Sequence, residues 1–169
     1  MKLVISPNPI LQQRAEDWTF DNLEEATTLE NEMIALMKTF RGIGLAANQV
    51  GLLKRVLAIQ LQKHPDRLEP FAMFNPSILS VSDEMQQGQE GCLSFPELWL
   101  DIKRPRQVDV EYFDKYKNKC TITLRDIDAR CFLHELDHLD GICFTEKVPP
   151  MRLLLALKQQ RNKNGRTKR

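Results

Sequence analysis

The chain has 169 residues, of which 42% are hydrophobic and 28% charged, with nine prolines and seven glycines. This length and composition are typical of one globular domain and exclude collagen-like, low-complexity and wholly disordered proteins. No stretch reaches the roughly 20 apolar residues that a membrane helix needs, and the N-terminus lacks the apolar core of a signal peptide. We therefore expect one domain over residues 1–169, in the cytoplasm.

The net charge of +1 conceals an uneven distribution. Residues 150–169 hold seven Lys or Arg and no acidic residue, whereas residues 1–149 hold 17 basic and 23 acidic residues. A basic tail on an acidic body indicates a surface for nucleic acid or another polyanion. A solvated terminus without a partner explains the same pattern equally well.

The four cysteines show neither C-x-x-C spacing nor the density of a disulfide scaffold. We expect free thiols in a reducing compartment, so a cysteine with a special role is a ligand or a nucleophile. They are Cys92, Cys120, Cys131 and Cys143.

Hydrophobic residues at helical spacing predict a first helix over residues 22–40, with Asp21 as its N-cap and Glu24 three residues later. A glycine loop follows. Alternating patterns bounded by Pro, Asn and Asp then predict strands, the last two joined by a turn at 115–118. The predicted strands cover residues 55–60, 71–74, 107–113 and 119–124.

A second helix is predicted to run to Leu139, with Asp126 or Asp128 as its cap and Gly141 as its stop. Two prolines then begin a third helical segment at 151–158. Helices at both ends of a run of hairpin-connected strands indicate an α+β fold rather than alternating βαβ units.

The strongest chemical signal is the H-E-x-x-H motif at residues 134–138, on the second predicted helix. Residues four apart on a helix differ by about 40° around its axis, so His134 and His138 can reach one metal ion. Glu135 lies beside them as a base for water. The alternative is a pair of surface histidines without a ligand role.

A catalytic metal site normally has a third protein ligand. No histidine follows His138, which argues against the H-E-x-x-H-x-x-G-x-x-H proteases, and Glu146 lies beyond the predicted helix end. Cys92 is the candidate, because Gly91 lets the backbone of its loop approach closely. The alternative for a single cysteine is a small buried hydrophobic residue.

The glycine loop at residues 42–49 formally matches the dinucleotide fingerprint G-x-G-x-x-A. That fingerprint follows a strand and begins a helix, whereas this loop follows a helix and precedes a strand. Its small residues instead favour an extended substrate lying along the backbone of Ile43 and Gly44. Gln49 is then placed to donate a hydrogen bond to developing negative charge.

Three segments, in this order and at these separations, closely resemble the signature motifs of peptide deformylases. They are residues 42–49 (Gly-Ile-Gly-Leu-Ala-Ala-Asn-Gln), 90–94 (Glu-Gly-Cys-Leu-Ser) and 134–138 (His-Glu-Leu-Asp-His). The resemblance implies antiparallel sheets packed around a central helix that carries H-E-x-x-H, with an N-terminal amphipathic helix and a C-terminal helix. It further implies removal of the N-formyl group from the initiator methionine of new polypeptides.

The resemblance also implies a metal centre of Cys92, His134 and His138, holding Fe(II) in bacterial members and able to hold Ni, Co or Zn. Glu135 would be the general base, and the Gln49 side chain and the Leu93 N–H would stabilise the oxyanion. Two positions depart from the family pattern. Leu133 stands where Gln is frequent, and Asn48 where Pro or Thr is common.

Helical geometry places Ile127 and Cys131 on the same side of the helix as His134. With Ile43 they are expected to form an apolar wall for the methionine side chain, with Gly44 and Gly91 beside the peptide backbone. Each of the three apolar residues is equally well explained as part of the core.

Two other functions are compatible with the motifs. Another H-E-x-x-H amidase or peptidase would cleave internal peptide bonds instead of releasing formate. A catalytically inactive ribosome-binding module would use the basic tail, although it would not need to retain Cys92, His134, Glu135 and His138. We expect a monomer that acts on formyl-methionyl nascent chains, docks on the ribosome through residues 150–169, and works in a bacterium or a phage-infected host rather than an organelle.

Overall fold

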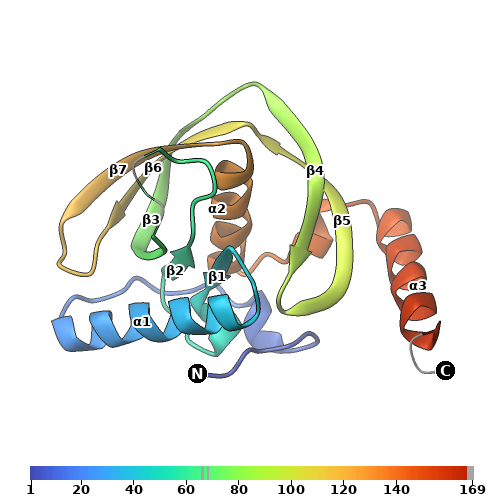
Figure 1. Cartoon of the computed structure of the whole chain (residues 1–169), viewed down its shortest axis with the longest axis horizontal. Coiled ribbons are helices and arrows are strands. Elements are labelled where there is room, and N and C mark those ends of the chain that lie inside the picture. Colours follow the sequence, from blue (N-terminus) through green and yellow to red (C-terminus); the bar gives the residue numbers. More distant parts are fainter. Residues whose placement is uncertain (66, 68, 167–169) are drawn as a thin grey trace.

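The fold combines two antiparallel sheets with α-helices on both sides of the larger one (Figure 1). The computed structural model describes residues 1–65, 67 and 69–166, and only the backbone of residues 162–166. A mixed helical and antiparallel fold was predicted and is confirmed. The larger sheet has the strand order β1 (Gly44–Ala46), β2 (Val56–Ile59), β3 (Phe71–Val81), β6 (Gln107–Phe113) and β7 (Lys119–Arg125). The smaller sheet pairs β4 (Met85–Cys92) with β5 (Phe95–Pro105).

The first helix, α1 (Leu23–Thr39), agrees closely with the predicted range, but its predicted cap is wrong. Asn22 is the N-cap, and its side chain accepts a hydrogen bond from the Glu24 N–H at 2.8 Å. Asn22 is in an extended conformation, which aims its side chain at the first free N–H groups of the helix. The apolar side of α1 packs on β1, β2 and β3 through Ala26, Leu29, Met33 and Met37.

The four predicted strands are present as β2, β3, β6 and β7, with β3 extending seven residues beyond its predicted end, to Val81. The β4–β5 hairpin and the short strand β1 were not predicted. In β5 the residues buried are alternate ones, Leu98, Leu100, Ile102 and Arg104, so one face of the strand points inward. β4 buries only Glu90 and Cys92, and its sequence therefore lacks an apolar alternation.

The second helix, α2 (Asp126–Leu139), ends at the predicted residue, and Gly141 follows in the left-handed conformation with φ +75°. Neither Asp126 nor Asp128 caps it. β7 leads directly into α2, so the N-cap is Arg125, whose side chain makes no capping bond. Figure 1 shows α2 in the middle of the molecule, where it contacts β1, β2, β6 and β7 of the larger sheet and β5 of the smaller. The H-E-x-x-H residues thus face the interior.

The third helix, α3 (Pro150–Arg166), is longer than predicted and lies at one side of the molecule against β5 (Figure 1). It packs on β5 through Leu153, Ala156 and Leu157, and its exposed side carries Met151, Leu154 and Leu155. Four basic side chains of the predicted tail, those of Lys163, Arg166, Lys168 and Arg169, lie outside the described residues. Within the described ranges, no helix is long and apolar enough to cross a membrane.

Candidate active site

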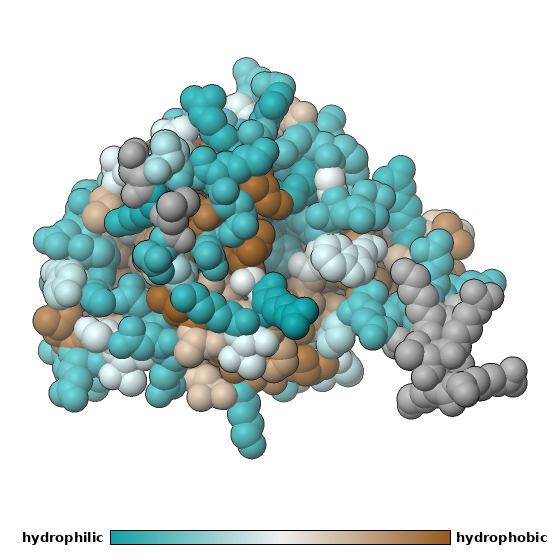
Figure 2. Space-filling view, viewed as in Figure 1, coloured by the Kyte–Doolittle hydropathy of each residue, from teal (hydrophilic) through white to brown (hydrophobic). Residues whose placement is uncertain are grey.

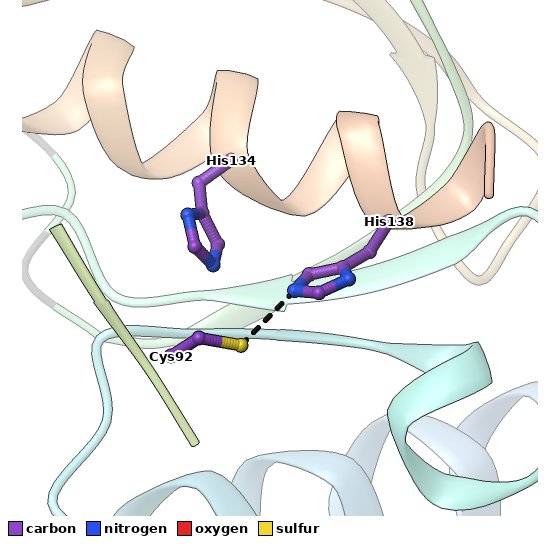
Figure 3. A group of neighbouring side chains, drawn as sticks. All are labelled: Cys92, His134 and His138. Carbon is purple, nitrogen blue, oxygen red and sulfur yellow. Dashed lines mark hydrogen bonds between the residues drawn. The ribbon is translucent and has the colours of Figure 1, made fainter. Parts of the chain in front are cut away.

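Three metal-ligand side chains meet where α2 faces the end of β4 (Figure 3). His134 and His138 extend from successive turns of α2 toward Cys92, the last residue of β4. All three side chains are buried, and one ligand atom from each lies within 4.8 Å of the others. The structure thus brings together the three residues that the sequence selected as ligands.

The donor set fits a divalent transition metal. The Cys92 Sγ lies 3.2 Å from the His138 Nε2, while the Nδ1 of His134 bonds to the Glu90 carboxylate at 2.9 Å. The Nε2 of His134 is therefore directed toward Cys92 and not toward Glu90. One thiolate and two imidazoles form a set that binds zinc or iron, and a carboxylate on the remote nitrogen of a ligating histidine is the usual supporting contact. The donor set thus supports a divalent metal.

Glu90 is a functional residue that sequence reasoning missed. Arg104 donates to both of its oxygens, at 2.6 and 2.9 Å, and Arg130 donates at 2.7 Å. Burial alone raises the pKa of the Glu90 carboxyl, but hydrogen bonds from His134 and Arg104 lower it to about 2. Glu90 is therefore ionised beside His134. Its position two residues before a ligand cysteine was the available signal, because a ligating histidine needs such a partner.

Glu135 points from α2 toward the glycine loop. A Cβ atom at Gly44 would lie 2.4 Å from its Oε1, so only glycine leaves room for this carboxylate. Its Oε2 is buried and has no hydrogen-bond partner among the described residues. Burial raises the pKa of Glu135 to about 7. The carboxyl can thus both accept and return a proton near neutral pH.

The loop side chain Gln49 is fully buried and fixed from both ends. Its Oε1 accepts a hydrogen bond from the Ala46 N–H at 2.7 Å, and its Nε2 lies 3.2 Å from the Ser94 Oγ and 3.4 Å from the Cys92 Sγ. The amide donor therefore lies beside the metal ligand set. Leu93, whose N–H was predicted to assist Gln49, lies between Cys92 and Ser94 and is half-buried.

An N-terminal strap, residues 4–6, joins the two loops that carry these groups. The Val4 N–H donates to the Gln49 carbonyl at 2.8 Å, and the Ser6 N–H donates to the Ser94 carbonyl at 2.9 Å. The strap thus links the glycine loop to the cysteine loop through two backbone hydrogen bonds.

Two of the three residues of the predicted apolar wall, Ile43 and Cys131, contact each other. The Cys131 thiol donates to the Ile43 carbonyl at 3.4 Å and lies where a Cβ of Gly44 would be. Ile127 is half-buried one helical turn earlier. Figure 2 shows hydrophobic side chains in the middle of this face, where Figure 1 places α2, surrounded by hydrophilic ones.

Gly91, the second glycine predicted to lie beside the substrate, is covered by the Trp99 ring. A Cβ atom at Gly91 would lie 3.0 Å from this ring, which is itself 60% exposed. No room remains on that face for a larger residue.

The two departures from the family pattern are both buried. The Asn48 amide donates to the backbone carbonyl of His138, which connects the glycine loop to the C-terminal end of α2. Leu133 packs in the core beneath the larger sheet. Neither side chain belongs to the ligand set.

Comparison with known proteins agrees with this geometry. The family model for polypeptide deformylase matches residues 1–153. The chain belongs to the peptide deformylase family. A peptide deformylase of Microchaete diplosiphon is 39% identical over 142 residues, covering 84% of this chain and 74% of the relative.

Solved structures of the family have the same fold. A peptide deformylase from Synechococcus elongatus in complex with actinonin superposes with a TM-score of 0.83 at 34% identity, covering 94% of this chain and 85% of that one. The peptide deformylase of Ehrlichia chaffeensis gives 0.86 at 29% identity, covering 99% and 98%. This chain is accordingly an enzyme, a metal-dependent hydrolase that removes N-formyl groups.

Proposed function

We propose that the chain removes the formyl group from the formyl-methionyl end of nascent polypeptides and that Cys92, His134, Glu135 and His138 carry the reaction. The buried ligand set with a carboxylate beside it, in a member of this family, is the observation that supports the proposal. The products are formate and a polypeptide with a free amino terminus.

Cys92, His134 and His138 hold one divalent ion, Fe(II) in the cell, with Zn, Ni or Co able to replace it. Such an ion supplies Lewis acidity, which lowers the pKa of water and polarises a carbonyl group. Glu90 holds the His134 ring in the orientation that presents its Nε2. A thiolate and two imidazoles suit these metals alike, since geometry and supply rather than affinity order decide between them.

Glu135 moves the protons. It accepts one from the attacking water, whose oxygen forms a bond to the formyl carbon. Negative charge then develops on the former carbonyl oxygen, where the Gln49 Nε2–H and the Leu93 N–H donate to it. The carbon–nitrogen bond breaks as Glu135 returns its proton to the amine nitrogen. The unpartnered Oε2 of Glu135 and the buried Gln49 amide beside Cys92 support these two roles.

The substrate lies extended along Gly44 and Gly91, with its first side chain against Ile43, Ile127 and Cys131. The space beside each glycine is filled by protein, by Glu135 and Cys131 at Gly44 and by Trp99 at Gly91, so the substrate lies along the backbone of these residues and not over that space. The apolar wall selects an unbranched hydrophobic side chain such as that of methionine.

Formate release from formyl-Met-Ala-Ser by anaerobically purified protein tests the reaction. Glu135→Gln, which keeps the size of the side chain, should lower kcat by about 10³-fold with the metal still bound. Glu25→Gln, on the exposed side of α1, is the matched control and should be as active as the parent. A fully metallated parent that releases no formate would favour the inactive ribosome-binding module, and cleavage of internal bonds would favour a peptidase.

We propose further that the chain acts as a monomer in the bacterial or phage-infected cytoplasm and docks on the ribosome through α3 and the basic tail. Truncation after Leu157 keeps the apolar residues that pack on β5 while removing six of the tail's seven basic residues. Turnover of the formyl peptide should be unchanged. Co-sedimentation with ribosomes should weaken and lose its salt dependence, and unchanged co-sedimentation would refute the docking role.

A further inference from the structure

Asp128 is a buried carboxylate in the first turn of α2 that the mechanism does not use. Its side chain is almost wholly buried, yet it caps no helix. Its Oδ1 accepts a hydrogen bond from the Gln62 N–H at 2.6 Å, and its Oδ2 accepts one from the Lys63 N–H at 3.1 Å. Burying a carboxylate is costly unless it is hydrogen-bonded, so this contact defines the conformation of the segment it binds.

That segment, residues 60–63, is attached at its other end to the glycine loop. The Gln60 N–H donates to the Ile43 carbonyl at 2.9 Å, and the Leu61 side chain is buried in the core cluster that contains Cys131. The side chains of Gln62 and Lys63 are exposed. Their backbone is therefore held on α2 by the two hydrogen bonds to Asp128, and the Gln62 side chain bonds within the segment, to the Gln60 carbonyl at 2.9 Å.

Both attachment points adjoin the proposed wall for the first side chain of the substrate. The Ile43 carbonyl accepts from the Gln60 N–H and from the Cys131 thiol. On α2, Ile127 and Cys131 share one side, and Asp128 is rotated about 100° from Ile127. Asp128 thus faces segment 60–63, while Ile127 and Cys131 lie on the side of α2 that carries the proposed wall.

We propose that Asp128 is a positioning residue that determines side-chain selectivity, because it holds against α2 the segment 60–63, which is hydrogen-bonded to Ile43. This role rests on the proposed function. It makes Asp128 one of the residues that determine which first side chain the enzyme prefers in its substrate. When the segment is fixed, the separation between Ile43 and α2 is fixed, and the pocket accepts a narrow, unbranched side chain. When it is released, the pocket widens and tolerates bulkier ones.

Asp128→Asn in the metal-loaded full chain tests the proposal. The variant keeps the shape of the side chain but places an N–H donor where one backbone N–H needs an acceptor. Asp126→Asn is the matched control, since Asp126 lies two residues earlier and its side chain pairs with Arg106 on the surface. The assay compares formyl-Met-Ala-Ser with formyl-Phe-Ala-Ser.

We expect Asp128→Asn to raise KM for the methionyl peptide about tenfold with kcat changed less than about threefold. The preference for Met over Phe in kcat/KM should fall by about tenfold, a difference typical of altered contacts in a hydrophobic pocket. Asp126→Asn should leave both quantities unchanged. A purely structural role for Asp128 would lower the active fraction, and hence kcat, without altering the Met-to-Phe ratio.

Hydrogen–deuterium exchange provides a readout independent of activity. Peptides covering residues 60–63 should exchange at least about tenfold faster in Asp128→Asn and at the parental rate in Asp126→Asn. Unchanged exchange would show that Asp128 does not hold the segment. Faster exchange with an unchanged Met-to-Phe ratio would show that the segment does not shape the pocket.

A parent protein that releases no formate would overturn the proposed function and this selectivity role together. If the parent is active and prefers Met to Phe, the variants test the role of Asp128 alone. If Asp128→Asn does not fold, Asp128→Ser, which retains one acceptor and removes the charge, is measured with the same peptides. Either variant giving parental selectivity and parental exchange refutes the proposal.

Discussion

Gly44 is the position where the smallest substitution should have the largest effect on catalysis. A Cβ atom there would lie 2.4 Å from the Glu135 Oε1, 2.8 Å from the Glu135 Cγ and 2.7 Å from the Cys131 Sγ. Ordinary van der Waals contact begins at 3.4 Å. Gly44→Ala must therefore displace Glu135, because β1 is paired with β2 and cannot retreat freely.

The distance that Glu135 must move determines how much activity Gly44→Ala should lose. Relieving the overlap moves the Glu135 carboxylate by about 1 Å, and a misplacement of that size costs about 10²-fold in rate. In activation free energy this corresponds to about 2.7 kcal/mol. Overpacking in a core also lowers the free energy of unfolding by about 1–3 kcal/mol, so stability has to be measured alongside activity.

The assay is kcat/KM for formyl-Met-Ala-Ser, with metal content and urea unfolding measured on the same preparations. Gly51→Ala is the control. A Cβ at Gly51 meets nothing within 4 Å, but φ is +84°, so this variant should lose about 1–2 kcal/mol of stability and retain parental activity. If Gly44→Ala is fully metallated and stays within threefold of the parent, Glu135 is not confined by Gly44 and the argument fails.

Four further predictions concern the metal site and its support. Glu90→Gln should weaken metal affinity about 10–100-fold by removing the anionic partner of His134, measured by competition with a chelator; parental affinity would contradict the role given to Glu90. The same variant should lower the free energy of unfolding by about 3–5 kcal/mol, because Glu90 is the buried counter-charge of both Arg104 and Arg130, and Asp137 remains beside Arg104 alone; urea titration measures it. Removing the metal with a chelator should abolish formate release, and adding Co(II) or Ni(II) should restore it. Asn48→Ala should cost about 0.5–1.5 kcal/mol of stability, because the His138 carbonyl loses the Asn48 donor but keeps the Gly141 N–H, and a smaller change in calorimetry would exclude that contact as a significant support.

The local elements were predictable because their signals are local. The apolar spacing of α1 and the left-handed Gly141 after α2 both act within a few residues. The helix caps were less predictable. Asn22 and Asp21 can both accept a capping hydrogen bond, and only the backbone conformation selects Asn22. The alternation in β5 was present in the sequence at Leu98 and Leu100, but its partner β4 has few apolar residues because it buries Glu90 instead.

In the candidate site, too, the residues with a local sequence signal were predictable and those that depend on distant contacts were not. His134 and His138 follow from a four-residue spacing, and Cys92 was selected by elimination and by the family motif. The partner of His134 lies 44 residues away, at Glu90, and a contact at that separation depends on how β4 is placed against α2. Asp128 was assigned to the helix cap because Asp is common there, whereas its carboxylate binds a loop more than 60 residues earlier in the chain.

Because of the strap at residues 4–6, a modification near the N-terminal end affects the site more directly than one near the C-terminal end. Its N–H groups hold the carbonyls of Gln49 and Ser94 from behind the site. An affinity tag, a protease cut or a surface attachment near that end would disturb the loops that present the oxyanion donors. A tag or attachment beyond α3 would instead act on a helix that packs against β5. Immobilised or labelled enzyme is therefore better attached through its C-terminal end.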